Sequence, residues 1–254
     1  MDFTGLSPLV LLISLLALGP YLMAFFLLKR SIAASSLGTR DKKGMSLVFP
    51  LLLSSWFLSV YYLARVGFFN AVPGPIPRIA YWLAVPLLLF AGLLRWNRKF
   101  ETLISNAPLS LAALAQTVRV GGLVFLFLAA RHQLPWLFAI PAAAGDFLVG
   151  ITAPWVAFAL GRGKQEDRGW LRFWNWAGLA DFALAVGIGL FAAPVPFRVF
   201  HTDPSTQMLG SFPMALIPAF VVPLCAMLHW ISLRNLSAQS PERLNRRVNR
   251  VTRS

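Results

Sequence analysis

The sequence predicts an all-α membrane protein with seven transmembrane helices, and three observations carry that prediction. Of the 254 residues, 57% are hydrophobic and 13% are charged, whereas a soluble domain has about 25% charged residues. The charged residues cluster between long apolar stretches. Seven of these stretches are long enough to cross a hydrocarbon core of about 30 Å. This pattern excludes a soluble globular enzyme, a disordered chain and a nucleic-acid-binding domain, although the formal net charge is +14.

The seven predicted spans follow one another through short connections. Lys29 and Arg30 follow the first apolar run, whereas a cleaved signal peptide has its positive charges in front, so we expect this span to be retained. The third span is the shortest and requires Arg95 and Trp96 to lie at the interface. Only residues 131–135 separate the fourth span from the fifth, which predicts an antiparallel hairpin. In order, the spans are Leu6–Leu28, Met45–Ala64, Ile79–Leu94, Pro108–Ala130, Trp136–Leu160, Phe173–Ala193 and Phe212–Leu233.

Lysine and arginine are distributed unevenly between the two sets of connecting segments. Segments 29–44, 95–107, 161–172 and 234–254 hold 18 of them, and the opposite segments hold 4. The positive-inside rule therefore predicts an N-terminus outside and a C-terminus in the cytoplasm, as in a multi-pass protein of a bacterial inner membrane.

The last basic segment has a pattern of its own. Residues 1–233 are expected to form the helix bundle, and residues 234–254 a basic tail beside the membrane. An amphipathic helix in the tail would bind anionic lipids. A solvated tail that only obeys the positive-inside rule is the alternative.

Ionisable residues inside the predicted spans are the informative ones. Arg119, Asp146, Asp181 and His229 lie within apolar stretches, where an arginine or aspartate costs about 2.5–3.5 kcal/mol near the helix centre. Such residues face the bundle interior or a water-filled cavity and usually pair. Small residues at helical spacing flank three of these positions, as expected where helices pack closely in lipid.

The depths of the ionisable residues in the membrane predict one ion pair. Arg119 lies 14 residues before Gln133 in the turn, and Asp146 lies 13 residues after it. At 1.5 Å per residue both lie about 20 Å from the turn. We therefore expect an Arg119–Asp146 ion pair near the midplane. The pair could form part of a binding site, or it could only fix the register of the two helices.

A second polar group is expected nearer the cytoplasmic side. Asp181 lies 8 residues into the sixth predicted span, Asn175 lies closer to its end, and His229 lies 4 residues from the end of the seventh. The depths of Asp181 and His229 differ by about 6 Å. One interpretation is that they share a cavity; the other is that His229 is an interfacial histidine whose hydrogen bonds are satisfied. Together the candidate ligand-binding or ion-binding residues are Arg119, Asp146, Asp181, His229, Gln116 and Asn175.

Prolines interrupt two of the spans. The fifth contains Pro141, followed by Gly145 and Asp146, and the seventh contains Pro213, Pro218 and Pro223. A proline removes an amide donor, and broken helices with an acidic residue at the break form midplane sites in several transporters. Proline is also simply common in membrane helices. For the fifth span both interpretations stay open, and for the seventh we favour the second.

The last four predicted spans contain a recurring set of short segments: 119–122, 134–139, 144–146, 175–181, 216–223 and 228–229. This set is similar to motifs of an uncharacterised family of bacterial multi-span inner-membrane proteins. The similarity covers roughly residues 116–233 and includes all four ionisable residues. It implies location and lineage, and no reaction or ligand.

The remaining residues limit the possible cofactors. All five lysines lie outside the predicted spans, which argues against covalently bound retinal. The sequence also argues against a haem, because His132 and His201 lie in loops and only Met23 has a depth similar to that of His229. A metal site is not indicated. The single cysteine, Cys225, excludes an intrachain disulfide.

Three functions are compatible with this pattern. The leading hypothesis is a small-solute or ion/proton-linked transporter with a polar site between the last four spans, in which Arg119 holds an anionic group or gates Asp146. The first alternative is a non-catalytic membrane subunit or sensor whose buried charges are structural. The second is a membrane-embedded enzyme acting on a lipid or quinone, with Asp181 and His229 as acid and base.

Overall fold

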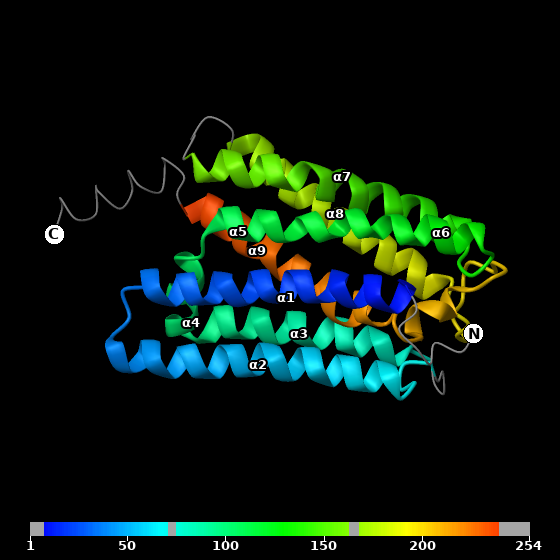
Figure 1. Cartoon of the computed structure of the whole chain (residues 1–254), viewed down its shortest axis with the longest axis horizontal. Helices are drawn as coiled ribbons and strands as arrows, with labels where there is room; N and C mark the ends of the chain where they lie inside the picture. Colours follow the sequence, from blue (N-terminus) through cyan, green and yellow to red (C-terminus); the bar gives the residue numbers. More distant parts are fainter. Residues whose placement is uncertain (1–7, 71–74, 163–167, 239–254) are drawn as a thin grey trace.

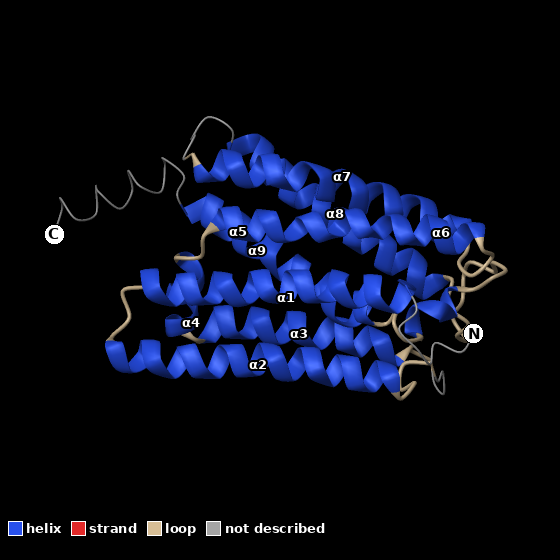
Figure 2. Cartoon of the chain, in the orientation of Figure 1, coloured by secondary structure: helices blue, strands red, loops and turns tan. Residues whose placement is uncertain are grey.

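The computed structural model describes residues 8–70, 75–162 and 168–238, and within them the chain is helical without a strand (Figure 2). Seven helical segments of the described residues are long and apolar enough to cross a membrane, which confirms the predicted all-α architecture and the number of candidate spans. The elements are α1 (Pro8–Ala34), α2 (Thr39–Arg65), α3 (Arg78–Trp96), α4 (Arg98–Ser105), α5 (Leu109–Leu114), η1 (Ala115–Leu123), α6 (Val124–Ala130), α7 (Trp136–Gly161), α8 (Arg168–Phe191), η2 (Thr206–Gly210), η3 (Ile217–Val221) and α9 (Val222–Ala238).

Figure 1 shows the helices in two groups, with α9 passing between them. Helices α1, α2 and α3 lie on one side, and α5, α6, α7 and α8 lie on the other. Helix α9 contacts α1, α3, α5 and α8. The span that contains α9 is the most buried of the seven, and α3 is among the least buried. A polar residue on α9 is therefore held among protein side chains.

Two helices extend further than hydropathy predicts. The predicted sixth span begins at residue 173, but α8 begins at Arg168, and α9 continues to Ala238 instead of ending at residue 233. Hydropathy detects the apolar part of a helix and not its ends, where arginine side chains reach toward the interface. The last span also starts later than predicted, at Ile217 instead of residue 212, because residues 212–215 form turns.

The prolines of the fifth span predict a helix break there, but the irregular helical segments lie in the fourth and seventh spans instead. Helix α7 runs without a break through Pro141 and Pro154, which corrects the broken-helix interpretation. Membrane helices tolerate proline when neighbouring groups satisfy the freed carbonyl. The fourth span instead contains the nine-residue 3₁₀ segment η1, and the seventh contains a π-turn, η3, at Pro218.

Segment η1 brings the fourth span very close to α7. Thr117, Val118 and Val120 are β-branched and two glycines follow, so the α-helical propensity is low. A Cβ atom built on Gly150 of α7 would lie 2.5 Å from the Val120 amide nitrogen, so the two backbones nearly touch. In a 3₁₀-helix, residues i and i+3 eclipse each other. This geometry aligns Gln116, Arg119 and Gly122 in one buried row.

Helix α4 directly follows α3 and has one buried and one exposed face. The Asn97 side chain caps it by accepting a hydrogen bond from the Phe100 amide at 3.0 Å. Phe100, Leu103 and Ile104 are buried, whereas Arg98 and Lys99 are exposed. This amphipathic pattern is that of a helix lying at the membrane interface.

Candidate functional site

Arg119 and Asp146 form the ion pair that depth counting predicts. Arg119 Nε donates to Asp146 Oδ1 at 2.8 Å, and the two side chains are 1% and 14% exposed. Helices η1 and α7 carry the two residues to the same height, and Gly122 allows the approach because a Cβ atom there would lie 2.6 Å from the Asp146 Cβ. Both head groups are therefore largely enclosed by protein.

Asp181 binds the same guanidinium, which corrects its predicted place in a second group. Arg119 Nη2 donates to Asp181 Oδ2, and the Asp181 side chain is 11% exposed. Since α8 begins at Arg168 and not at residue 173, Asp181 lies 13 residues from the helix start. That is about 20 Å, and not the 12 Å that the predicted span implied. The longer helix therefore brings Asp181 to the depth of Arg119.

His229 completes the contacts of the arginine. Its Nε2 lies 3.1 Å from Arg119 Nη1, and its Nδ1 lies 2.9 Å from Asn175 Oδ1. A guanidinium can only donate, so Nε2 accepts and the hydrogen is on Nδ1, which donates to Asn175. Asn175 Nδ2 in turn donates to the Leu171 carbonyl at 2.7 Å. This chain of bonds fixes the ring, and we call Arg119, Asp146, Asp181, His229 and Asn175 the Arg119 cluster.

Two residues of the cluster's surroundings were not among the predicted site residues. The Arg119 guanidinium lies 3.9 Å from the centroid of the Phe182 ring, a cation–π contact. The Gly178 carbonyl accepts from Arg119 Nη1 at 3.4 Å. Gly178 lies three residues before Asp181 on α8, so helical spacing from Asp181 could have found it. Phe182 directly follows Asp181 but lies four residues after Gly178, so only spacing from Gly178 could have found it.

Gln116 is a candidate whose side chain donates its hydrogen bond outside the cluster. It is buried in the same row as Arg119, but its Nε2 donates to the Cys225 carbonyl of α9 at 3.0 Å. Its Oε1 has no hydrogen-bond partner within the described residues. Gln116 therefore ties η1 to α9 one 3₁₀ turn away from Arg119.

The charges of the cluster do not cancel when both carboxylates are ionised. Arg119 brings one positive charge, Asp146 and Asp181 bring two negative charges, and His229 accepts from Arg119 as a neutral ring. A surplus charge in a low-dielectric interior is costly. One proton or one bound cation would neutralise the cluster.

A cavity of about 280 Å³ reaches Asp146 from one end of the bundle. Pro77 and Gln207 line it in the connecting segments, and Asp146 and Phe182 line it within the bundle. Its other walls, from α3, α7, α8, η2 and η3, are almost entirely apolar. We call it the Asp146 cavity. It gives one carboxylate of the cluster a contact surface for a small molecule or ion.

Arg119 is poorly placed to bind an anion that enters through this cavity. Four acceptors already surround its guanidinium: Asp146, Asp181, the Gly178 carbonyl and His229 Nε2. A guanidinium has five N–H donors, so most of its capacity is in use. Asp146 is the group of the cluster that a solute could reach.

The described residues offer little support for a metal or haem. They contain no group of three or more His, Cys, Asp or Glu side chains that could hold a metal ion. Both nitrogens of the His229 ring are engaged by Arg119 and Asn175, so haem ligation would break one of these bonds. His229 does not line the Asp146 cavity either, so its acid–base role stays a prediction.

A comparison with protein families identifies the family of this chain. Residues 76–237 match the family described as Domain of unknown function (DUF8737), and the chain belongs to that family. The match includes α3, which lies before the region of similarity found in the sequence, and it contains every residue of the Arg119 cluster. Comparisons with curated proteins and with solved structures gave no match.

Proposed function

We propose that this chain is a membrane transporter for a small solute, linked to a proton or cation, with its binding site in the Asp146 cavity and the Arg119 cluster. The observation that carries the proposal is a buried, charge-unbalanced cluster with one carboxylate on the wall of a cavity of about 280 Å³. Ionisable residues at this depth are costly and usually mark solute, ion or proton pathways.

The chemistry of the cavity favours a cationic solute. Its walls are apolar except for a few polar groups, and its charged wall residue is Asp146. Binding a cation there, or a proton, would balance the second carboxylate of the cluster. An ammonium group at Asp146 with an apolar body in the cavity fits both features.

The orientation and location are part of this proposal. The excess of lysine and arginine in segments 29–44, 95–107, 161–172 and 234–254 supports an N-terminus outside and a C-terminus in the cytoplasm of a bacterial inner membrane. The tail expected to bind anionic lipids lies mostly beyond residue 238, outside the described residues.

A non-transporting subunit or sensor is the second candidate, because the guanidinium is so well satisfied. The four acceptors around Arg119 join η1 to α7, α8 and α9. A cluster of this kind can fix helix packing without binding a ligand. The two candidates differ in whether Asp146 has to be available to a solute.

A thermal-shift experiment on the purified full chain separates them. The probes are sodium, potassium, tetramethylammonium and primary alkylamines of increasing length, with alkyl carboxylates as the series of opposite charge. A ligand at about 100 times its Kd stabilises the native state by about 2.7 kcal/mol. We expect at least one cation of the panel to raise the melting temperature, and the carboxylates to have no effect.

The control variants decide whether Asp146 is responsible. Asp146→Asn should abolish the shift, whereas Asp203→Asn, which changes an exposed aspartate outside the Asp146 cavity, should leave it intact. A complete lack of shifts across the panel, or a shift that survives in Asp146→Asn, would contradict the proposed site and favour the structural candidate.

A further inference from the structure

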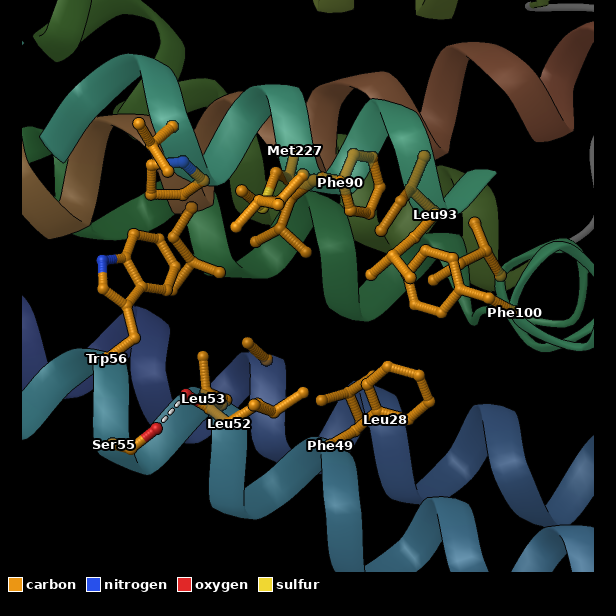
Figure 3. A pocket seen from close by; sticks show the side chains of 18 of the residues that line it. Leu28, Phe49, Leu52, Leu53, Ser55, Trp56, Phe90, Leu93, Phe100 and Met227 are labelled. Carbon is orange, nitrogen blue, oxygen red and sulfur yellow. Dashed lines mark hydrogen bonds between the residues drawn. The ribbon is translucent and has the colours of Figure 1, made fainter. Parts of the chain in front are cut away.

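A second, larger cavity lies between α2 and α3, away from the Arg119 cluster. Its volume is about 550 Å³. Figure 3 shows side chains of α2, such as Trp56 and Phe49, facing Phe90 and Leu93 of α3 across the open space. Helices α1 and α9 contribute further walls, among them Leu28 and Met227. We call it the α2–α3 cavity.

The walls of this cavity are apolar and part of them faces the bilayer. Leu52, Val85 and Leu89 line the cavity, and they are 55%, 48% and 64% exposed. These residues lie on membrane-spanning helices, so the medium at the opening is hydrocarbon and not water. A membrane lipid can therefore reach the cavity sideways, between α2 and α3.

The length of the cavity matches one leaflet of a bilayer. On α2 it extends from Phe49 to Ser59, and the ten helical steps between them span about 15 Å. Half of the hydrocarbon core is also about 15 Å. One end lies at Phe100 and Ile104 of the interfacial helix α4, and the other lies beyond Trp56, at Ser59 of α2 and Tyr81 of α3. A single acyl chain that starts at the interface would run the length of the cavity.

The α4 end of the cavity has a surplus of positive charge. Arg95 and Arg98 are exposed at the connection between α3 and α4, next to the lining residues Leu93 and Phe100. The acidic residues nearby are already paired: Asp41 accepts from Lys99 at 2.7 Å, and Glu101 accepts from Arg234. The two arginines are thus available to an anionic group at the interface.

We propose that the α2–α3 cavity binds one anionic phospholipid, with an acyl chain in the cavity and its phosphate on Arg95 and Arg98. The apolar lining and the length of the cavity match an acyl chain of one leaflet. The two exposed arginines match the phosphate of the head group. The proposal is independent of the solute site at Asp146.

Native mass spectrometry of the full chain tests it. The protein is released from nanodiscs that contain equal amounts of phosphatidylglycerol and phosphatidylcholine. We expect one retained lipid per chain, with a preference of about tenfold for phosphatidylglycerol, since basic side chains near the surface attract anionic lipids. Equal retention of both lipids by the unmodified chain would overturn the anionic head-group assignment.

Two kinds of variant distinguish the site of the acyl chain from the site of the lipid head group. Leu89→Trp fills the exposed side of the cavity and should abolish retention, whereas Leu148→Trp, on the exposed face of α7, should not. The double variant Arg95→Gln and Arg98→Gln should retain lipid without preference for phosphatidylglycerol. Unchanged retention in Leu89→Trp, or a second copy of the chain in place of lipid, would overturn the proposal.

Discussion

Replacing Arg119 with glutamine is expected to destabilise the folded chain by about 3–5 kcal/mol, the usual cost of removing one partner from a buried ion pair. The substitution leaves Asp146 and Asp181 buried without their shared donor, and it removes the partner of His229 Nε2. Chemical unfolding of the full chain in mixed micelles measures the loss. Arg131→Gln, which changes an exposed arginine in the turn before α7 whose side chain lies over the Phe127 ring, should cost less than about 1 kcal/mol.

Replacing either carboxylate should destabilise the folded chain less than replacing Arg119. Asp146→Asn leaves one guanidinium and one carboxylate, a balanced pair, and an amide oxygen still able to accept from Arg119 Nε. We expect a loss of only about 1–3 kcal/mol. Asp146→Asn combined with Asp181→Asn leaves an unpaired buried guanidinium, and its loss should match that of Arg119→Gln. Equal losses in Arg119→Gln and Arg131→Gln would contradict the buried cluster.

Replacing Gly178 with alanine is expected to cost about 1–3 kcal/mol, as overpacking of a tight interior does. A Cβ atom at this position would overlap the His229 ring and lie 3.1 Å from Arg119 Nη1, and both groups are held by buried hydrogen bonds. The substitution should therefore separate α8 from α9 at the cluster. The same unfolding experiment measures it.

Gly187, on the same helix, provides the matched control. A Cβ atom there would meet nothing within 4 Å. Alanine is a better helix former than glycine by about 0.8–1.0 kcal/mol, so Gly187→Ala should be neutral or stabilising. The two substitutions are thus expected to have opposite signs. A neutral Gly178→Ala would mean that α8 and α9 do not meet closely at His229.

Hydropathy and helix geometry predicted much of this molecule from its sequence. The seven spans follow from the length of the apolar stretches, and the Arg119–Asp146 pair follows from equal distances to the turn at residues 131–135. Both arguments use only the rise per residue of a helix, which η1 and α7 follow closely enough. The presence of buried charge was sufficient to identify the cluster's main members.

The predicted depths of residues in the membrane were wrong where the ends of the helices were misjudged. Asp181 and His229 were expected nearer one face because hydropathy ends a span at its last apolar residue, whereas α8 and α9 continue through arginines. The 3₁₀ segment around Arg119 has weak local signals, two glycines and three β-branched residues, and its form depends on contact with α7. The two cavities depend on how helices distant in sequence pack, which no spacing reveals.

The most direct test of the central claim is whether water-soluble cations reach the Asp146 cavity inside the membrane. In a Cys225→Ser chain reconstituted into liposomes, Ala185→Cys places a thiol on the cavity wall of α8, and Leu184→Cys places one on the exposed face of the same helix. A quaternary ammonium methanethiosulfonate is a water-soluble cation that reacts with thiolates. It therefore modifies only thiols that water can reach. We predict rapid modification of Ala185→Cys and little of Leu184→Cys. Equal resistance of both thiols would contradict a solute-accessible site at Asp146.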